Sequence, residues 1–143
     1  MVRRSICIAV STLAVAPASA QCLGAFDGFG ASGVRADLNG GAVFASAVFD
    51  DGAGAQLYVG GWFDVAGDVR STAIARWNGA QWAELADGIA GASPRVYALR
   101  SFDDGSGPAL YVGGSFASAG NQAAQGVARW SSSGWESLPG LGA

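Results

Sequence analysis

Two pairs of adjacent aspartates are the residues of this chain whose chemistry is easiest to name. Each pair is followed by a glycine, so Asp50, Asp51, Asp103 and Asp104 all fall in short polar segments. Ca²⁺ prefers several oxygen ligands, which makes these four carboxylates candidate calcium ligands. Their spacing lacks the alternating Asp-x-Asp-x-Asp-Gly of dedicated calcium loops, and turn formation alone explains Asp and Gly at such positions. Adjacent carboxylates on one turn also do not flank a sugar from two sides, which argues against a glycosidase.

The composition removes most other catalytic chemistry. The chain contains no histidine, so Ser-His-Asp and Cys-His arrangements, histidine acid–base catalysis and the usual zinc and copper sites are excluded. An enzyme built on this chain would depend on carboxylates, tyrosines or a bound cation. We therefore predict a non-enzymatic protein without a cofactor, with a calcium site and a metal-dependent carboxylate enzyme fragment as the alternatives.

The elements that would position these groups are repeated within the chain. The segment from Val43 to Ala90 recurs without a gap from Val96 to Ala143, and close to half of the aligned positions are identical. Both aspartate pairs occupy the same place in the repeat. A period near 50 residues, made of short apolar runs and Gly-rich turns, is typical of β-propeller blades.

Each copy predicts four short strands. In the first copy they are expected at 42–49, 56–63, 73–77 and 81–85, and the first two recur at 95–102 and 109–116. The aspartate pair and its glycine form the turn between the first two strands. Longer connections are expected at 64–71 and 117–125. The sequence thus predicts an all-β fold with two four-stranded antiparallel blades, an incomplete propeller.

An Asn-Gly pair at 78–79 predicts a tight two-residue hairpin between the third and fourth strands. That register places Trp77 opposite Ala80, so Trp77 and Trp82 become diagonal neighbours on one face. Trp130 and Trp135 keep the same spacing in the second copy. We expect these tryptophans to form the packing layer between blades; stacking on a sugar ring is the alternative.

Two further repeated features carry expectations. The Gly60-Gly61 pair in the second strand lacks side chains, which predicts the close approach of another backbone or a bulge. Arg76 and Arg129 each precede a tryptophan. We expect their guanidinium groups to pair with carboxylates of a neighbouring blade or to lie over a tryptophan ring.

The first twenty residues have the pattern of a secretory signal peptide. Arg3 and Arg4 give a positive start, an apolar run covers 6–16, and Ala18-Ser19-Ala20 is a small-residue cleavage site. The apolar run is shorter than the roughly 20 residues that a membrane-spanning helix needs. We predict cleavage after Ala20, no membrane span, and a secreted, periplasmic or cell-surface protein.

Cysteine usage gives no internal disulfide. Cys7 leaves with the signal peptide, and Cys22 is the only other cysteine. An inert thiol is expected at Cys22. Lipid attachment and an intermolecular disulfide stay open, although Gln21 departs from the small residue that usually precedes the cysteine of a bacterial lipoprotein.

The charge balance bears on partners. Without residues 1–20 the chain keeps six arginines against eleven carboxylates, a net charge near −5, and it has no lysine. Nucleic-acid binding needs concentrated positive charge and is therefore not expected. Protein or glycan partners, and further blades or copies of the chain itself, are the partners that the sequence allows.

The repeated string Leu-Tyr-Val-Gly-Gly-x-Phe-x-x-Ala-Gly, followed by Ala-Arg-Trp and a second tryptophan, resembles a known family. It covers 57–67 with 75–82, and 110–120 with 128–135. It is similar to repeats of secreted bacterial β-propellers of the kelch-like type, and more distantly to fungal cortical polarity-marker propellers. The resemblance implies a scaffold or recognition surface at the cell exterior. Kelch-type copper oxidases need histidine ligands that this chain lacks.

These observations divide the chain into a signal peptide at 1–20, a Gly-rich segment at 21–41, and blade repeats at 42–94 and 95–143. The Gly-rich segment is expected to supply an outer strand around Phe26–Phe29. Propellers close with about four to eight blades, so two blades leave apolar faces that need cover. Either the chain is a piece of a longer propeller, which we favour, or several copies assemble into a ring.

Overall fold

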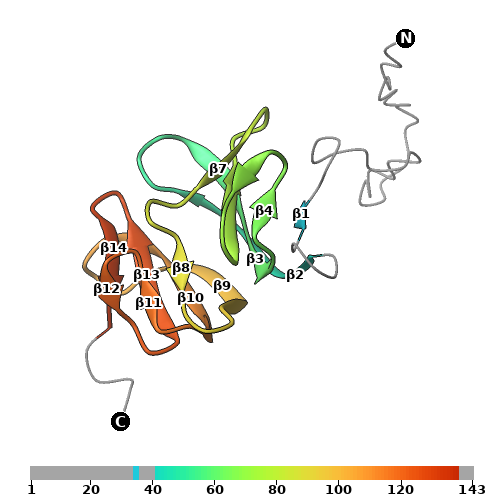
Figure 1. The fold of residues 1–143 in the computed structure, drawn as a ribbon. Coiled ribbons are helices and arrows are strands. Elements are labelled where there is room, and N and C mark those ends of the chain that lie inside the picture. Colours follow the sequence, from blue (N-terminus) through green and yellow to red (C-terminus); the bar gives the residue numbers. More distant parts are fainter. Residues whose placement is uncertain (1–33, 36–40, 139–143) are drawn as a thin grey trace, which may run out of the picture.

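The computed structural model describes residues 34–35 and 41–138, and every regular element in them is a β-strand (Figure 1). The all-β prediction is confirmed. The predicted signal peptide, the outer strand around Phe26–Phe29 and Cys22 lie outside the described residues.

The first copy forms a four-stranded antiparallel sheet, here called the first sheet. Its strands, in spatial order, are β2 (Ala42–Asp50), β3 (Ala55–Trp62), β6 (Ile74–Trp77) and β7 (Trp82–Glu84). The second copy forms the second sheet with the equivalent order: β9 (Arg95–Asp103), β10 (Pro108–Ser115), β13 (Val127–Ser131) and β14 (Gly134–Ser137). The boundaries predicted for the four strands of the first copy and for the first two of the second copy agree with these to within one residue. Neither sheet closes on itself.

The longer connections predicted at 64–71 and 117–125 each contain a short hairpin. They are β4 (Val65–Ala66) with β5 (Val69–Arg70), and β11 (Ser118–Ala119) with β12 (Gln122–Ala123). A third strand pairs with each hairpin: β1 (Val34–Arg35) with β4, and β8 (Ile89–Ala90) with β11. Gly67 and Gly120 permit the reversals, because both adopt a left-handed φ, +60° and +55°.

The predicted register of the tryptophan hairpin is wrong by two residues. Trp77 lies directly opposite Trp82, not opposite Ala80. The reason is local: the Asn78 side-chain Oδ1 accepts the backbone N–H groups of both Ala80 and Gln81, at 2.9 and 2.8 Å, which widens the turn. A shift of two keeps the side chains on the same face. The tryptophans therefore still pair, with ring centroids 5.3 Å apart.

Each sheet has two chemically distinct faces, because directly paired residues share a face. We call one the tyrosine face, which carries Tyr58 in the first sheet and Tyr111 in the second. The opposite one is the tryptophan face, with the Trp77–Trp82 pair in the first sheet and Trp130–Trp135 in the second. The corresponding faces are built by equivalent residues of the two copies.

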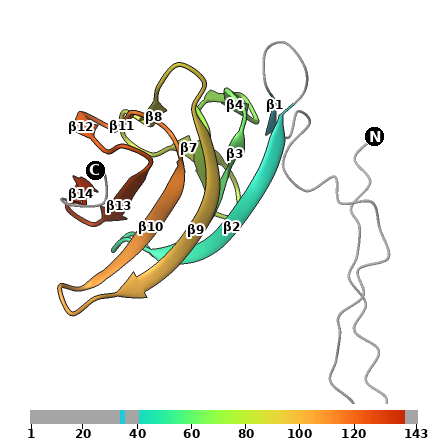
Figure 2. The ribbon, with the colours of Figure 1, turned by 90° about the horizontal axis from the view of Figure 1, so that it is seen from below.

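The two sheets pack with the tyrosine face of the first against the tryptophan face of the second. One buried cluster joins Tyr58 and Ile74 of the first sheet to Leu110, Trp130 and Trp135 of the second. Both of these tryptophans are 9 % exposed, which confirms their predicted place in a packing layer. The long strands β2, β9 and β10 run side by side in Figure 2.

The Gly60-Gly61 pair in β3 explains how closely β3 approaches the neighbouring strands. A Cβ on Gly61 would lie 1.9 Å from the Ala42 carbonyl oxygen of β2. The pairing of β2 and β3 also shifts register between Val43 and Ala45. A Cβ on Gly60 would lie 2.4 Å from the Val96 side chain of the second sheet. The predicted bulge and close approach are both present, and Gly60 also makes room for the neighbouring sheet.

Candidate binding groove between the two sheets

A polar cluster centred on Asp51 ties the two sheets together. Its Oδ2 accepts hydrogen bonds from Tyr58 Oη at 3.0 Å and from Arg76 at 3.0 Å, both in the first sheet. It also accepts the Trp130 indole N–H of the second sheet at 3.2 Å. The Asp51 side chain is only 7 % exposed. One carboxylate oxygen thus receives three donors from β3, β6 and β13, and this network spans 79 residues of sequence.

Burial and hydrogen bonding act in opposite directions on Asp51. Burial alone would raise the pKa of this carboxyl, but the donors Trp130, Tyr58 and the Ala53 amide, with the Arg76 charge, hold the pKa below its ordinary value. Burial, followed by the nearby Asp51 charge, raises the pKa of Tyr58 to about 12. Asp51 therefore stays ionised and Tyr58 stays protonated across the neutral range.

The second sheet repeats this cluster on its own tyrosine face, without an indole among the described donors. Tyr111 Oη donates to Asp104 Oδ2 at 2.7 Å, and Arg129 donates to the same oxygen at 3.3 Å. Arg129 also donates to Glu136 at 2.6 Å and to Ser106 Oγ at 2.6 Å. Asp104 here is 38 % exposed.

These contacts fix the charges of the second cluster. Hydrogen bonds from Ser106 and Tyr111 hold the pKa of Asp104 well below its usual range. The bond to Asp104 raises the pKa of Tyr111, and the bond to Glu136 raises the pKa of Arg129. Asp104 and Arg129 are therefore permanent opposite charges near neutral pH.

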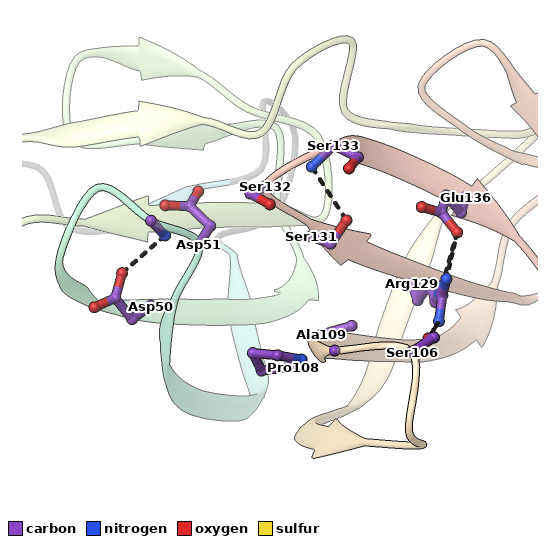
Figure 3. Close-up of a pocket in the computed structure, with 12 residues that line it drawn as sticks. Asp50, Asp51, Ser106, Pro108, Ala109, Arg129, Ser131, Ser132, Ser133 and Glu136 are labelled. Atoms are coloured by element: carbon purple, nitrogen blue, oxygen red, sulfur yellow. Dashed lines mark hydrogen bonds and ion pairs between the residues drawn. The ribbon is translucent and has the colours of Figure 1, made fainter.

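A groove of about 510 Å³ lies between the two clusters, where the aspartate turn of the first sheet meets the second sheet (Figure 3). Figure 3 shows Asp50 and Asp51 on one side and Arg129, Ser106 and Glu136 on the other. Its lining residues are Asp50, Asp51, Gly52, Ser106, Gly107, Pro108, Ala109, Arg129, Ser131, Ser132, Ser133 and Glu136. Hydroxyl groups and charged side chains dominate this lining, so the groove suits a polar ligand.

Ser106 is the groove hydroxyl that lies beside a carboxylate, and its contacts do not suit a nucleophile. Ser106 Oγ donates to Asp104, which could in principle act as its base. An efficient general base has a pKa near the working pH, however, and Asp104 is held far below it. Arg129 also donates to Ser106 Oγ and occupies one of its lone pairs. Ser106, Asp104 and Arg129 are hydrogen-bonded to one another. These bonds hold the polar groups in fixed positions, which suits the binding and orientation of a ligand.

The four candidate calcium ligands separate into two structural roles. Asp50 Oδ1 accepts the amides of Gly52 and Gly54, and Asp103 Oδ1 accepts the equivalent pair in the second copy. These two residues shape their turns. Asp51 and Asp104 face the tyrosine side chains instead. Within residues 34–35 and 41–138, no three His, Cys, Asp or Glu side chains gather in a way that could hold a metal ion.

The arginine expectation is wrong about the source of the carboxylates. Arg76 pairs with Asp51, and Arg129 pairs with Asp104 and Glu136, all within the same sheet as the arginine. The cause is the turn after the first strand, which folds its second aspartate back over its own sheet. Among the described residues, the guanidinium of Arg95 lies over a tryptophan, 5.2 Å from the Trp62 ring centroid.

Sequence reasoning missed the tyrosines and the hydroxyl groups of the groove. Tyr58 and Tyr111 each follow the second aspartate of their turn by seven residues. That constant spacing, across a hairpin, is the signal that would have paired them. Ser106 and Glu136 have no counterpart of the same type in the first copy, so the repeat does not reveal them.

No family model matches the chain, and neither the curated proteins nor the solved structures include one significantly similar to it. In the part of the chain that the structure describes, no helix is long and apolar enough to cross a membrane.

Proposed function

We propose that this chain is an exported, non-enzymatic β-propeller repeat module of the kelch-like type, serving as a scaffold or binding surface outside the cytoplasm. On this proposal each four-stranded sheet is one blade. The observation that carries it is the stacking of two sheets with equivalent strand order, tyrosine face against tryptophan face, with β2 and β9 side by side. Radial repetition of such sheets is how propellers bury their faces.

The polar groups support binding in preference to catalysis. Asp51 and Asp104 are held ionised by their hydrogen bonds, and the arginines that face them are already paired. A fixed, hydrogen-bonded surface of this kind recognises a ligand without supplying a proton donor or acceptor near neutral pH.

A carbohydrate-binding module is the second candidate, and one observation favours it. Phe44 and Tyr97 are 48 % and 51 % exposed, and their rings stack at a centroid distance of 5.7 Å. An exposed aromatic pair of this kind offers a platform for a sugar ring. Trp82, Trp130 and Trp135, by contrast, are buried and do not provide one.

The two candidates are separated by titrating the purified protein with a panel of soluble glycans while following its melting temperature. The scaffold proposal expects no glycan to raise the melting temperature. A rise that disappears in Tyr97→Ala, with the circular dichroism spectrum unchanged, would establish the carbohydrate module instead. The same scans with calcium and with a chelator test the metal alternative, since a resident ion stabilises the folded state it binds.

Export is tested separately by expressing the full chain in a bacterial host and analysing the intact mass of the product outside the cytoplasm. Cleavage after Ala20 predicts a mature protein that begins at Gln21. A product that retains residues 1–20 and stays in the cytoplasm would refute the exported location and leave the blade architecture untouched.

A further inference from the structure

The contact between the two sheets joins one tyrosine face to one tryptophan face. Each sheet has both kinds of face, so one face of each kind is not used in this contact. The first sheet contributes its tyrosine face, where Phe49 and Gly60 lie. The second contributes its tryptophan face, where Val96 lies. The same residue types recur at the equivalent positions Phe102, Gly113 and Val43. The tyrosine face of the second sheet and the tryptophan face of the first are the halves that this contact leaves unused.

The tyrosine face of the second sheet is exposed where its counterpart is buried. Phe102 is 57 % exposed, whereas Phe49 in the contact is 5 % exposed. The Asp104 side chain is 38 % exposed, against 7 % for Asp51. Phe49 and Asp51 thus lie against the tryptophan face of the second sheet, whereas their counterparts Phe102 and Asp104 remain exposed.

In the contact, a valine side chain (the knob) fills the space above a glycine (the hole), and the equivalent valine and glycine of the unused faces are both accessible. Val96 is fully buried and fills the space above Gly60. Its counterpart Val43 is 44 % exposed. A Cβ placed on Gly113 would meet only the Ala98 side chain, at 3.7 Å, among the described residues. One valine thus projects from the first sheet, and one glycine site lies open on the second.

We propose that the tyrosine face of the second sheet docks the tryptophan face of the first sheet of a second copy, repeating between chains the contact made within one. This inference rests on the proposed function, because it treats each sheet as a blade. In the docked pair Val43 sits over Gly113 of the second copy, and Phe102 becomes buried as Phe49 is. Such a contact is head-to-tail, so it generates a ring or an open chain of copies.

A second copy is the occupant because its surface has the required residues. Leu57 of the first sheet is partly exposed and is identical to Leu110, which is fully buried in the cluster that joins the two sheets. Trp77 corresponds in the same way to Trp130, the donor to Asp51. Trp77 already takes part in an interaction of its own, and in the docked pair its indole ring would lie beside Asp104 of the second copy, as Trp130 lies beside Asp51.

The test is sedimentation velocity of the full mature chain over roughly 1–300 µM, a range that covers micromolar association. Val43→Glu removes the knob from one face, and Gly113→Val fills the hole on the other. Each variant is expected to weaken self-association at least tenfold, with circular dichroism unchanged. Val48→Glu is the matched control, because it adds the same charge to the same face of the same strand, where Val48 is 63 % exposed. Its counterpart in the second sheet, Ser101, stays exposed in the contact, so docking should not cover Val48.

Mixing the two variants decides the geometry. Gly113→Val keeps an intact Val43, and Val43→Glu keeps an open Gly113, so an equimolar mixture is expected to form a one-to-one complex. A mixture that stays dissociated, or an association that Val48→Glu weakens equally, would overturn the proposal. A wild-type chain that is β-rich but monomeric at every concentration would also overturn it while leaving the blade module standing. A chain without β-rich circular dichroism would refute the proposed module itself.

Discussion

Replacing Asp51 by Asn, with Asp104→Asn as its internal control, is the sharpest test of the polar cluster between the sheets. The two aspartates occupy the same turn position and face the same partners, a tyrosine and an arginine of their own sheet. They differ in the Trp130 indole that donates to Asp51, in the Ser106 hydroxyl that donates to Asp104, and in the burial of the side chain. The substitution keeps the shape and removes the charge.

The expected loss at Asp51 follows from what the amide leaves unsatisfied. Removing one partner of a buried charged network costs about 3–5 kcal/mol. Arg76 is 29 % exposed, so solvent screens part of this, and we expect about 2–4 kcal/mol. For a folded region of about 100 residues this corresponds to a fall in melting temperature on the order of 15 °C. Asp104→Asn is expected to produce roughly a third of that fall or less, because exposed ion pairs contribute little.

The assay is urea and thermal denaturation of both variants, followed by tryptophan fluorescence and far-ultraviolet circular dichroism at a concentration where the chain is monomeric. The indoles of the second sheet report the contact directly because both are buried in it. Equal destabilisation by the two substitutions would refute the reasoning, since the Trp130 bond would then contribute nothing. So would a loss below 1 kcal/mol at Asp51.

Three other outcomes are expected. The pKa of Tyr58 rises to about 12 on folding. The protonated tyrosine therefore stabilises the folded state fully below the unfolded pKa of about 10, and this contribution is lost as pH rises through 12. Urea denaturation at alkaline pH should show that the wild type loses about 3 kcal/mol of unfolding free energy, a loss that Tyr58→Phe lacks. The pKa of Asp51 is lowered in the folded state. The ionised carboxylate therefore stabilises the fold above the unfolded pKa of about 3.9, and this stabilisation is lost as pH falls through the folded pKa. The unfolding free energy of the wild type should thus fall more steeply with decreasing pH than that of Asp51→Asn. Gly120→Ala should lower the melting temperature much more than Gly88→Ala does. Both glycines have a left-handed φ, but of the two only Gly120 has a side chain close to the added Cβ, that of Trp135 at 2.8 Å. Equal losses would show that backbone strain, and not the contact with Trp135, causes the destabilisation.

The sequence predicts the strands of both sheets because short alternating runs bounded by Asp, Gly and Asn leave few alternatives. It also predicts which face each tryptophan occupies, since a shift of register by two does not change the face. It does not predict that Trp77 meets Trp82 directly. That outcome depends on the Asn78 side chain, whose Oδ1 accepts the amides of Ala80 and Gln81 inside the turn.

The groove is harder to predict because its partners are distant in sequence. The aspartate turns are identified as polar from their composition, but the bond between Asp51 and Trp130 joins residues 79 positions apart. Only the packing of one sheet on the other decides that Asp51 faces an indole while Asp104 does not. The repeat makes the two sites look alike, and the sheet contact makes them different.

The consecutive order of strands within each sheet has a kinetic consequence. β2, β3, β6 and β7 pair in the order in which they follow one another in the sequence, and so do β9, β10, β13 and β14, with only a short hairpin inserted in each sheet. Pairings between nearby segments close short loops and form quickly, whereas the contact between sheets brings together distant ones. Hairpins within each repeat are thus expected to form first and the sheets to dock late. On that order, substitutions at the Asp51–Trp130 bond accelerate unfolding and leave the refolding rate almost unchanged.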